Sequence, residues 1–127
     1  MRSSKALWVA GFVSVVFVLL GVRAFLDPVA ASASFGLPMH TEADTAFVRI
    51  YGARNALLGL LALVFTARRM LPPLVLLFTL ATVLPLLDAA VIASQIGLGR
   101  ELVRHGVILL VLAAVSLSLW RLRDVRA

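Results

Sequence analysis

Four long apolar runs divide this chain and leave few choices for its fold. They cover about residues 6–26, 47–66, 74–94 and 102–120. Each run has close to the ~20 residues that a helix needs to cross the hydrocarbon core of a bilayer. Hydrophobic residues make up 62% of the 127 residues, against about 45–50% in a soluble domain. The sequence therefore predicts an all-α integral membrane protein, a four-helix up-down bundle that forms one domain over residues 1–127.

The segments between the runs contain residues that end and begin helices. Asp27 precedes Pro28, and a residue before proline avoids the helical region, so the first helix is expected to end there. Pro72 and Pro73 suit the first turn of the third helix. The polar, small-residue segment from Asp27 to Asp44 is expected to form a loop over one end of the bundle.

A secretory signal is an alternative interpretation of the first run. Arg2 and Lys5 precede it, and residues 31–33 read Ala-Ser-Ala, which resembles a cleavage site. The run is, however, longer than the ~7–15 residues of a signal core. Arg23 and Asp27 also intervene before that site. We therefore expect the first run to be a membrane span.

The charged residues are distributed unevenly between the two ends of the predicted bundle. The end with both termini carries the basic residues Arg2, Lys5, Arg68, Arg69, Arg121, Arg123 and Arg126, and one acidic residue, Asp124. Basic and acidic residues are equal in number at the other end, so the whole net charge of +6 lies on one side. The positive-inside rule then places both termini in the cytoplasm. We expect the membrane to be a bacterial plasma membrane. Because topology alone explains the positive charge, nucleic-acid binding is not expected.

Polar residues from all four spans converge on the outer half of this arrangement. With a rise of ~1.5 Å per residue, Arg54 and Asp88 both lie roughly 10 Å below the outer surface. Arg23 is near the outer end of the first span, and His105 near that of the fourth. A charge at the centre of a bilayer costs about 2.5–3.5 kcal/mol or more, so these groups should face the bundle interior. We expect an ion pair between Arg54 and Asp88.

Helical spacing groups these residues into faces, which predicts a candidate site. Residues three, four or seven apart share a face of a helix. Gly52 and Gly59, seven apart, offer a strip for close helix packing. The expected catalytic residues are Arg54, Asp88 and His105, and the expected ligand-binding residues are Arg23, Asp27, Tyr51, Asn55 and Gln95.

Structural interpretations of the same residues stay open. The Arg54–Asp88 pair would also fix helix register, Arg23 would snorkel to the interface, and Asp27 would cap or end a helix. His105 would meet lipid headgroups or a backbone carbonyl. His40 lies near two carboxylates in the first loop, but the chain has no cysteine and only one other histidine, so no metal is expected.

Several stretches of the chain resemble a known family. They are "GVRAFLDPVAASASFGLP", "YGARNALLGLLAL", a lone Asp88 in the third span and His105 opening the fourth. In these features the chain resembles small four-helix bacterial and fungal membrane proteins that are described as a domain of unknown function and are similar in size and topology to DoxX-like proteins. The resemblance implies a fold but no established reaction.

These observations favour a protein that binds a lipophilic molecule carrying an anionic or carbonyl oxygen. Arg54 would hold that oxygen, Asp88 would orient Arg54, and His105 would exchange a proton in an isomerisation or cyclisation type of conversion. The expected partners are the lipid bilayer and this molecule, and no cofactor is expected. An alternative is a non-catalytic accessory subunit, with a homo-oligomer or a partner membrane subunit meeting the polar cluster. A transporter, suggested by Pro85 beside Asp88, has less support because the cytoplasmic half is almost purely apolar.

Overall fold

The protein is a bundle of helices. The computed structural model describes residues 2–126, and the described residues form helices with no strand among them. The helices are α1 (Arg2–Leu26), α2 (Pro28–Phe35), α3 (Glu42–Ala67), α4 (Leu71–Ala81), α5 (Val83–Ile96) and α6 (Glu101–Arg126). Four stretches are long and apolar enough to cross a membrane, namely Ser4–Leu26, Glu42–Ala67, Leu71–Ile96 and Glu101–Val125. The predicted all-α class is confirmed, and each predicted run lies within one of these stretches.

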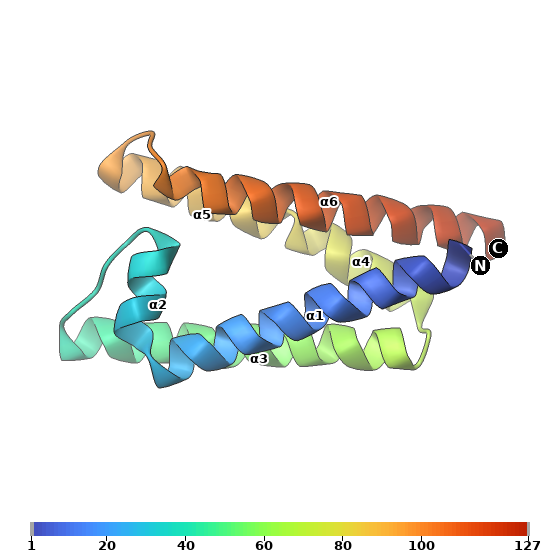
Figure 1. Ribbon diagram of the computed structural model, residues 1–127, viewed down its shortest axis with the longest axis horizontal. Helices are drawn as coiled ribbons and strands as arrows, with labels where there is room; N and C mark the ends of the chain where they lie inside the picture. Colours follow the sequence, from blue (N-terminus) through green and yellow to red (C-terminus); the bar gives the residue numbers. More distant parts are fainter. Residues whose placement is uncertain (1, 127) are drawn as a thin grey trace.

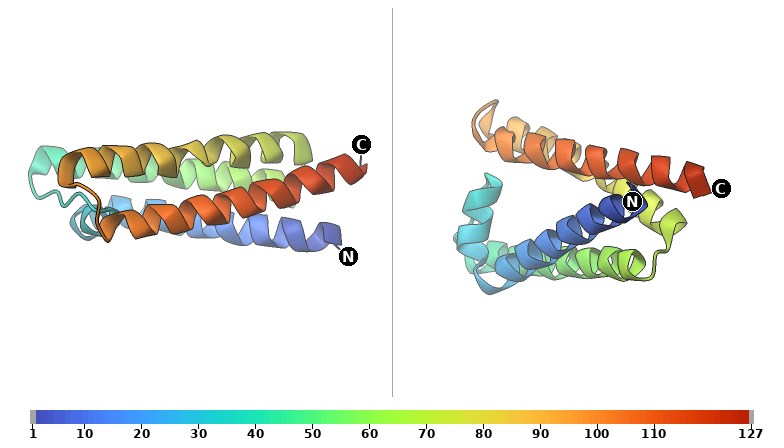
Figure 2. Two further views of the ribbon diagram at one scale, coloured as in Figure 1. Left: turned by 90° about the horizontal axis from the view of Figure 1, so that it is seen from above. Right: turned by 45° about the vertical axis from the view of Figure 1, so that its right-hand side comes forward.

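The long helices form two layers that meet at one end and separate at the other. Figure 1 shows α1 beside α3 in one layer and α5 beside α6 in the other, with α4 leading from the end of α3 to the second layer. Both termini lie at the end where the layers meet, which we call the closed end. The layers diverge toward the other end, the open end, where α2 lies between them (Figure 2).

Small residues allow α1 and α3 to pack closely. A Cβ added to Gly52 would lie 2.6 Å from the carbonyl oxygen of Gly21 and 2.8 Å from the Cβ of Ala24. A Cβ added to Gly59 would lie 2.8 Å from the backbone nitrogen of Val18. Backbones approach this closely only where no side chain intervenes. The predicted role of Gly52 and Gly59 in helix packing is therefore confirmed.

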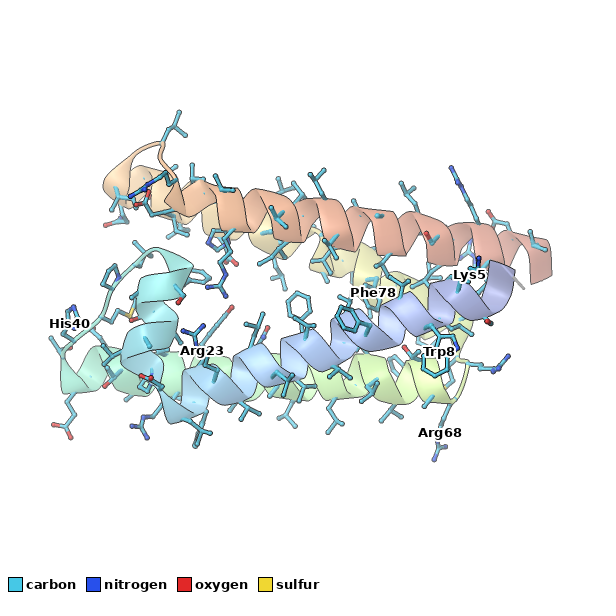
Figure 3. All side chains as sticks on the ribbon, viewed as in Figure 1. Lys5, Trp8, Arg23, His40, Arg68 and Phe78 are labelled. Carbon is cyan, nitrogen blue, oxygen red and sulfur yellow. The ribbon has the colours of Figure 1, made fainter. Side chains whose placement is uncertain are left out.

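The hydrophobic core lies at the closed end. Its buried members come from α1, α3, α4 and α6: Leu7, Ala10, Val13, Ala62, Leu71, Leu74, Val75, Phe78, Leu112, Val115, Leu119 and Leu122. Figure 3 shows Phe78 toward the closed end and Arg23 toward the open end, beside α2. This core joins the two layers at the closed end.

The third apolar stretch is broken into α4 and α5 close to Pro85. Proline has no N–H, so the carbonyl of Ala81 loses its usual helical donor four residues later. At this point the N–H of Thr82 donates instead to the carbonyl of Thr79 at 3.3 Å, and the Thr82 hydroxyl donates to the same oxygen at 2.6 Å. The break lies one to two turns before Asp88.

A small polar network crosses the interface of α4 and α6 near the core. The indole Nε1 of Trp120 donates to the hydroxyl of Thr79 at 2.9 Å, and the hydroxyls of Thr79 and Ser116 lie 2.8 Å apart. The guanidinium of Arg123 lies 3.8 Å from the Trp120 ring centroid. The hydrogen bond of Trp120 thus joins α6 to α4.

Candidate functional site

A large cavity occupies the open end between the two layers. Its volume is about 650 Å³, and side chains from all six helices line it. Ligand sites in proteins have volumes of roughly 300–1,000 Å³, so the cavity is large enough for a small lipophilic molecule. It begins where the hydrophobic core ends, since Phe78, Ala62 and Leu112 belong to both.

The lining of the cavity differs between its two ends. Toward α2 apolar residues such as Phe35, Leu37, Met39 and Phe47 also line it, but the polar side chains gather here: Arg23, Tyr51, Arg54, Asn55, Asp88, Arg104 and His105. Toward the core it contains apolar side chains, among them Phe17, Leu58, Leu77, Phe78, Leu80, Ile108 and Leu112. A molecule with a polar head and an apolar tail matches this distribution.

Helix α2 covers the cavity at the open end, and local residues define its bounds. Asp27 caps its start by accepting a hydrogen bond from the N–H of Ala30 at 3.2 Å, and Pro28 occupies the first position. Gly36 ends it with a φ of 110°, a left-handed conformation that favours glycine. The predicted loop therefore contains a helix, although the three residues that define it were visible in the sequence.

His105 joins α6 to the end of α2. Its Nε2 lies 2.9 Å from the carbonyl oxygen of Phe35, and because a carbonyl can only accept, Nε2 is the donor. The ring is 2% exposed and meets the Phe35 ring edge-on, with centroids 4.7 Å apart. One of the structural interpretations of His105, contact with a backbone carbonyl, is thus what the structure shows. This contact holds α2 over the cavity.

Asp88 is paired with His105 and not with Arg54. Its Oδ2 lies 4.0 Å from Nδ1 of His105, and the Asp88 side chain is 34% exposed. The only other ion pair among the described side chains joins Arg123 to Asp124. The expected Arg54–Asp88 pair is therefore wrong, although both residues line the cavity. The depth argument gave the same level for both but no information on the direction of either side chain.

The other predicted residues of α1 and α3 contribute to the wall in different ways. Arg23 donates from Nη2 to the hydroxyl of Ser34 in α2 at 3.2 Å. Asn55 donates from Nδ2 to the carbonyl of Phe17 in α1 at 3.2 Å, so it also joins two helices. Tyr51 meets the Phe35 ring edge-on at a centroid distance of 5.9 Å.

Two predicted ligand-binding residues lie outside the cavity lining. Asp27 acts as the N-cap of α2, and Gln95 is exposed near the end of α5. The side chains of His40, just before α3, and of Glu42 and Asp44, in the first turn of α3, do not gather: no group of three or more possible metal-ligating residues occurs among the described residues. The charged groups of the cavity thus come from the spans and not from the segment between the first two spans.

Arg104 lines the cavity and was not among the predicted site residues. It precedes His105 on α6 and is half-buried. In the sequence it is one of the balanced charges at the outer end. Its proximity to Glu101, three residues earlier, gave no sign that it faces inward.

The fold and the cavity together define a class: small all-α proteins with four membrane-length helices and a cavity, polar at one end, between them. A family model described as "Domain of unknown function (DUF4267)" matches residues 14–119, and the chain belongs to this family. The match includes every residue of the cavity lining, and it confirms the resemblance to a family of unknown function. Searches of curated proteins and of solved structures found no match.

Proposed function

We propose that this protein binds, within the membrane, a lipophilic molecule that carries an anionic or carbonyl oxygen. The observation that carries the proposal is the two-ended lining of the cavity, polar beside α2 and apolar toward the core. The guanidinium of Arg54 would hold the oxygen, and the tail would lie against side chains such as Phe78 and Leu112. Few precisely placed polar groups in a mainly apolar cavity are typical of ligand sites.

The proposal includes an orientation in the membrane. The four spans would cross a bacterial plasma membrane as an up-down bundle, with both termini in the cytoplasm. Lys5 and Arg68 lie toward the closed end with the termini, whereas Arg23 and His40 lie toward the open end (Figure 3). This distribution agrees with the excess of basic residues expected on the cytoplasmic side. The cavity then opens in the outer half of the bilayer.

The ligand would enter sideways from the bilayer, between α3 and α5. In the described chain these two helices have no close backbone contact. The wall between them is made by side chains, of which Arg54, Leu58 and Leu84 are exposed. Arg54 and Leu58 also border a shallower groove on α3 with Leu57 and Leu61. A molecule dissolved in lipid reaches the cavity by this route without crossing water.

Identification of a retained molecule tests the binding function. In native mass spectrometry of gently purified protein, the wild type should retain one specific lipophilic molecule. Ala81→Phe should release it, because Ala81 lines the cavity and a phenyl ring would occupy its volume. Ala90→Phe is the matched control, since Ala90 is exposed on α5 outside the lining. Ligand-free protein in all three samples would count against the cavity as a binding site and would favour an accessory subunit.

A second candidate function, proton transfer to the bound molecule, rests on the Asp88–His105 pair. Asp88 is the only carboxylate in the described cavity lining and is partly exposed there. His105 lies behind Asp88 with Nε2 bonded to the backbone, so Asp88 is the group that would meet the ligand. Nδ1 of His105 lies 4.0 Å from Oδ2 of Asp88 and would have to move closer to exchange a proton with it. An isomerisation or cyclisation needs such a group to take up or release a proton.

Asp88→Asn separates conversion from binding. The amide keeps the size of the side chain but exchanges no proton, so the variant should bind the retained molecule and leave it unconverted. Comparing the masses and chromatographic positions of the molecules extracted from the wild type and the variant measures this. Identical products from both proteins would show that Asp88 has no part in a conversion.

A further inference from the structure

Three arginines from three different helices line the cavity. They are Arg23 of α1, Arg54 of α3 and Arg104 of α6. None has an ion pair with a carboxylate among the described side chains, where the recorded pairs are His105–Asp88 and Arg123–Asp124. The recorded hydrogen bond of Arg23 goes to a neutral hydroxyl, that of Ser34. The cavity therefore has three guanidinium groups without an anionic partner.

The charges in the cavity are out of balance. A guanidinium stays protonated in proteins, so the three arginines contribute three positive charges. Asp88, already beside His105, is the single carboxylate in the described lining. With His105 counted as neutral, the excess is two positive charges in a region that lipid would surround. Charges in a low-dielectric region are costly unless an opposite charge compensates them. An anionic ligand would supply that opposite charge.

We infer that the ligand is an amphiphile with an anionic head, and that a phosphate monoester is the head that matches best. This inference rests on the proposed function, because it names the class of molecule that the cavity binds. A phosphate monoester has three terminal oxygens and a charge of about −1.5 to −2 near pH 7. Arginine presents paired N–H donors that match two phosphate oxygens at once. A neutral head would leave the excess positive charge uncompensated.

The head lies beside α2 and the tail runs toward the core. Arg23 and Arg104 line the polar part of the cavity, and Arg54 stands at the wall between α3 and α5. Phe17, Leu58 and Ile108 then form the beginning of the apolar part. Free inorganic phosphate satisfies the arginines but leaves this apolar part unfilled, so an alkyl phosphate should bind more tightly.

A series of ligands with one tail and different heads tests the inference. We would titrate the protein in nanodiscs of zwitterionic lipid with dodecyl phosphate, dodecanoate and dodecanol, and with excess inorganic phosphate as a competitor. Dodecyl phosphate should bind about ten-fold or more tightly than dodecanol, since one hydrogen bond to a charged group contributes at least that much. Dodecanoate should fall between them. Inorganic phosphate should not displace dodecyl phosphate.

Variants of the cavity arginines test whether the preference for a phosphate head arises in the cavity. Arg104→Gln and Arg54→Gln should each weaken the binding of dodecyl phosphate by about ten-fold and leave the binding of dodecanol unchanged. Arg49→Gln is the control, because Arg49 is exposed on α3 outside the lining. If one cavity variant does not fold, the other still gives the comparison.

Each contrary result has its own meaning. Equal affinities for dodecyl phosphate and dodecanol would overturn the inference of an anionic head but leave the proposed function intact. Dodecanoate as the tightest ligand overturns the phosphate assignment, and displacement by inorganic phosphate assigns the arginines to a free anion. If no member of the series binds, both the inference and the proposed function fail.

Discussion

Gly52→Ala should destabilise the protein by about 2 kcal/mol or more, although it adds only one methyl group. The added carbon would lie 2.6 Å from the Gly21 carbonyl oxygen and 2.8 Å from the backbone nitrogen of Phe25. These are backbone atoms, so no rotamer change relieves the contact and α1 must move away from α3. The measurement is the midpoint of unfolding in a titration with sodium dodecyl sulfate, followed by circular dichroism or fluorescence.

Gly106→Ala is the matched control for this prediction. Gly106 also lies within a long helix, but a Cβ added there meets no atom within 4 Å. Alanine has a higher helix propensity than glycine, so the control should keep or slightly raise the midpoint. Similar midpoints for the two variants would mean that the contact between α1 and α3 is not the main support of that layer.

His105→Ala should destabilise the protein by about 2–4 kcal/mol and release α2 from α6. The substitution removes a buried ring and leaves the carbonyl of Phe35 without its donor. Backbone amides of α2 should then exchange with deuterium faster, whereas those of the α1–α3 layer should change less. Hydrogen exchange followed by mass spectrometry separates these two regions.

His40→Ala provides the comparison, because His40 is the other of the two histidines and is exposed in the loop before α3. It should leave both the unfolding midpoint and the exchange of α2 unchanged. If His105→Ala gives unchanged exchange in α2 as well, the hydrogen bond to Phe35 does not hold that helix, and α2 is supported by its other contacts.

The four long apolar stretches could be predicted as helices from the sequence, because a helix that crosses a bilayer needs that length and composition. The sequence was also sufficient for Gly52 and Gly59, whose spacing places them on one face. The short helix α2 was missed because an eight-residue helix has no long periodic pattern. Its signals were the residues at its two ends, and these fitted a loop equally well.

Most polar residues that line the cavity could be predicted from the sequence, but the arrangement of their side chains could not. Depth along a helix follows from residue number, so Arg54 and Asp88 were correctly expected in the same half of the bundle. The direction of each side chain depends on how the helices are rotated and inclined, which no residue spacing determines. This explains why Asp88 meets His105 instead of Arg54, and why Arg104, one residue before His105, was overlooked.

The separation of the two layers makes the width of the cavity sensitive to small changes in angle. The layers are joined by the core at the closed end and by α2 at the open end. A rotation of one layer relative to the other would therefore be centred on the core. Twenty residues of helix span about 30 Å. Over that lever arm, a relative rotation of about 5° displaces the far end by roughly 2–3 Å. In a membrane, the thickness and lateral pressure of the bilayer would act on that same arm.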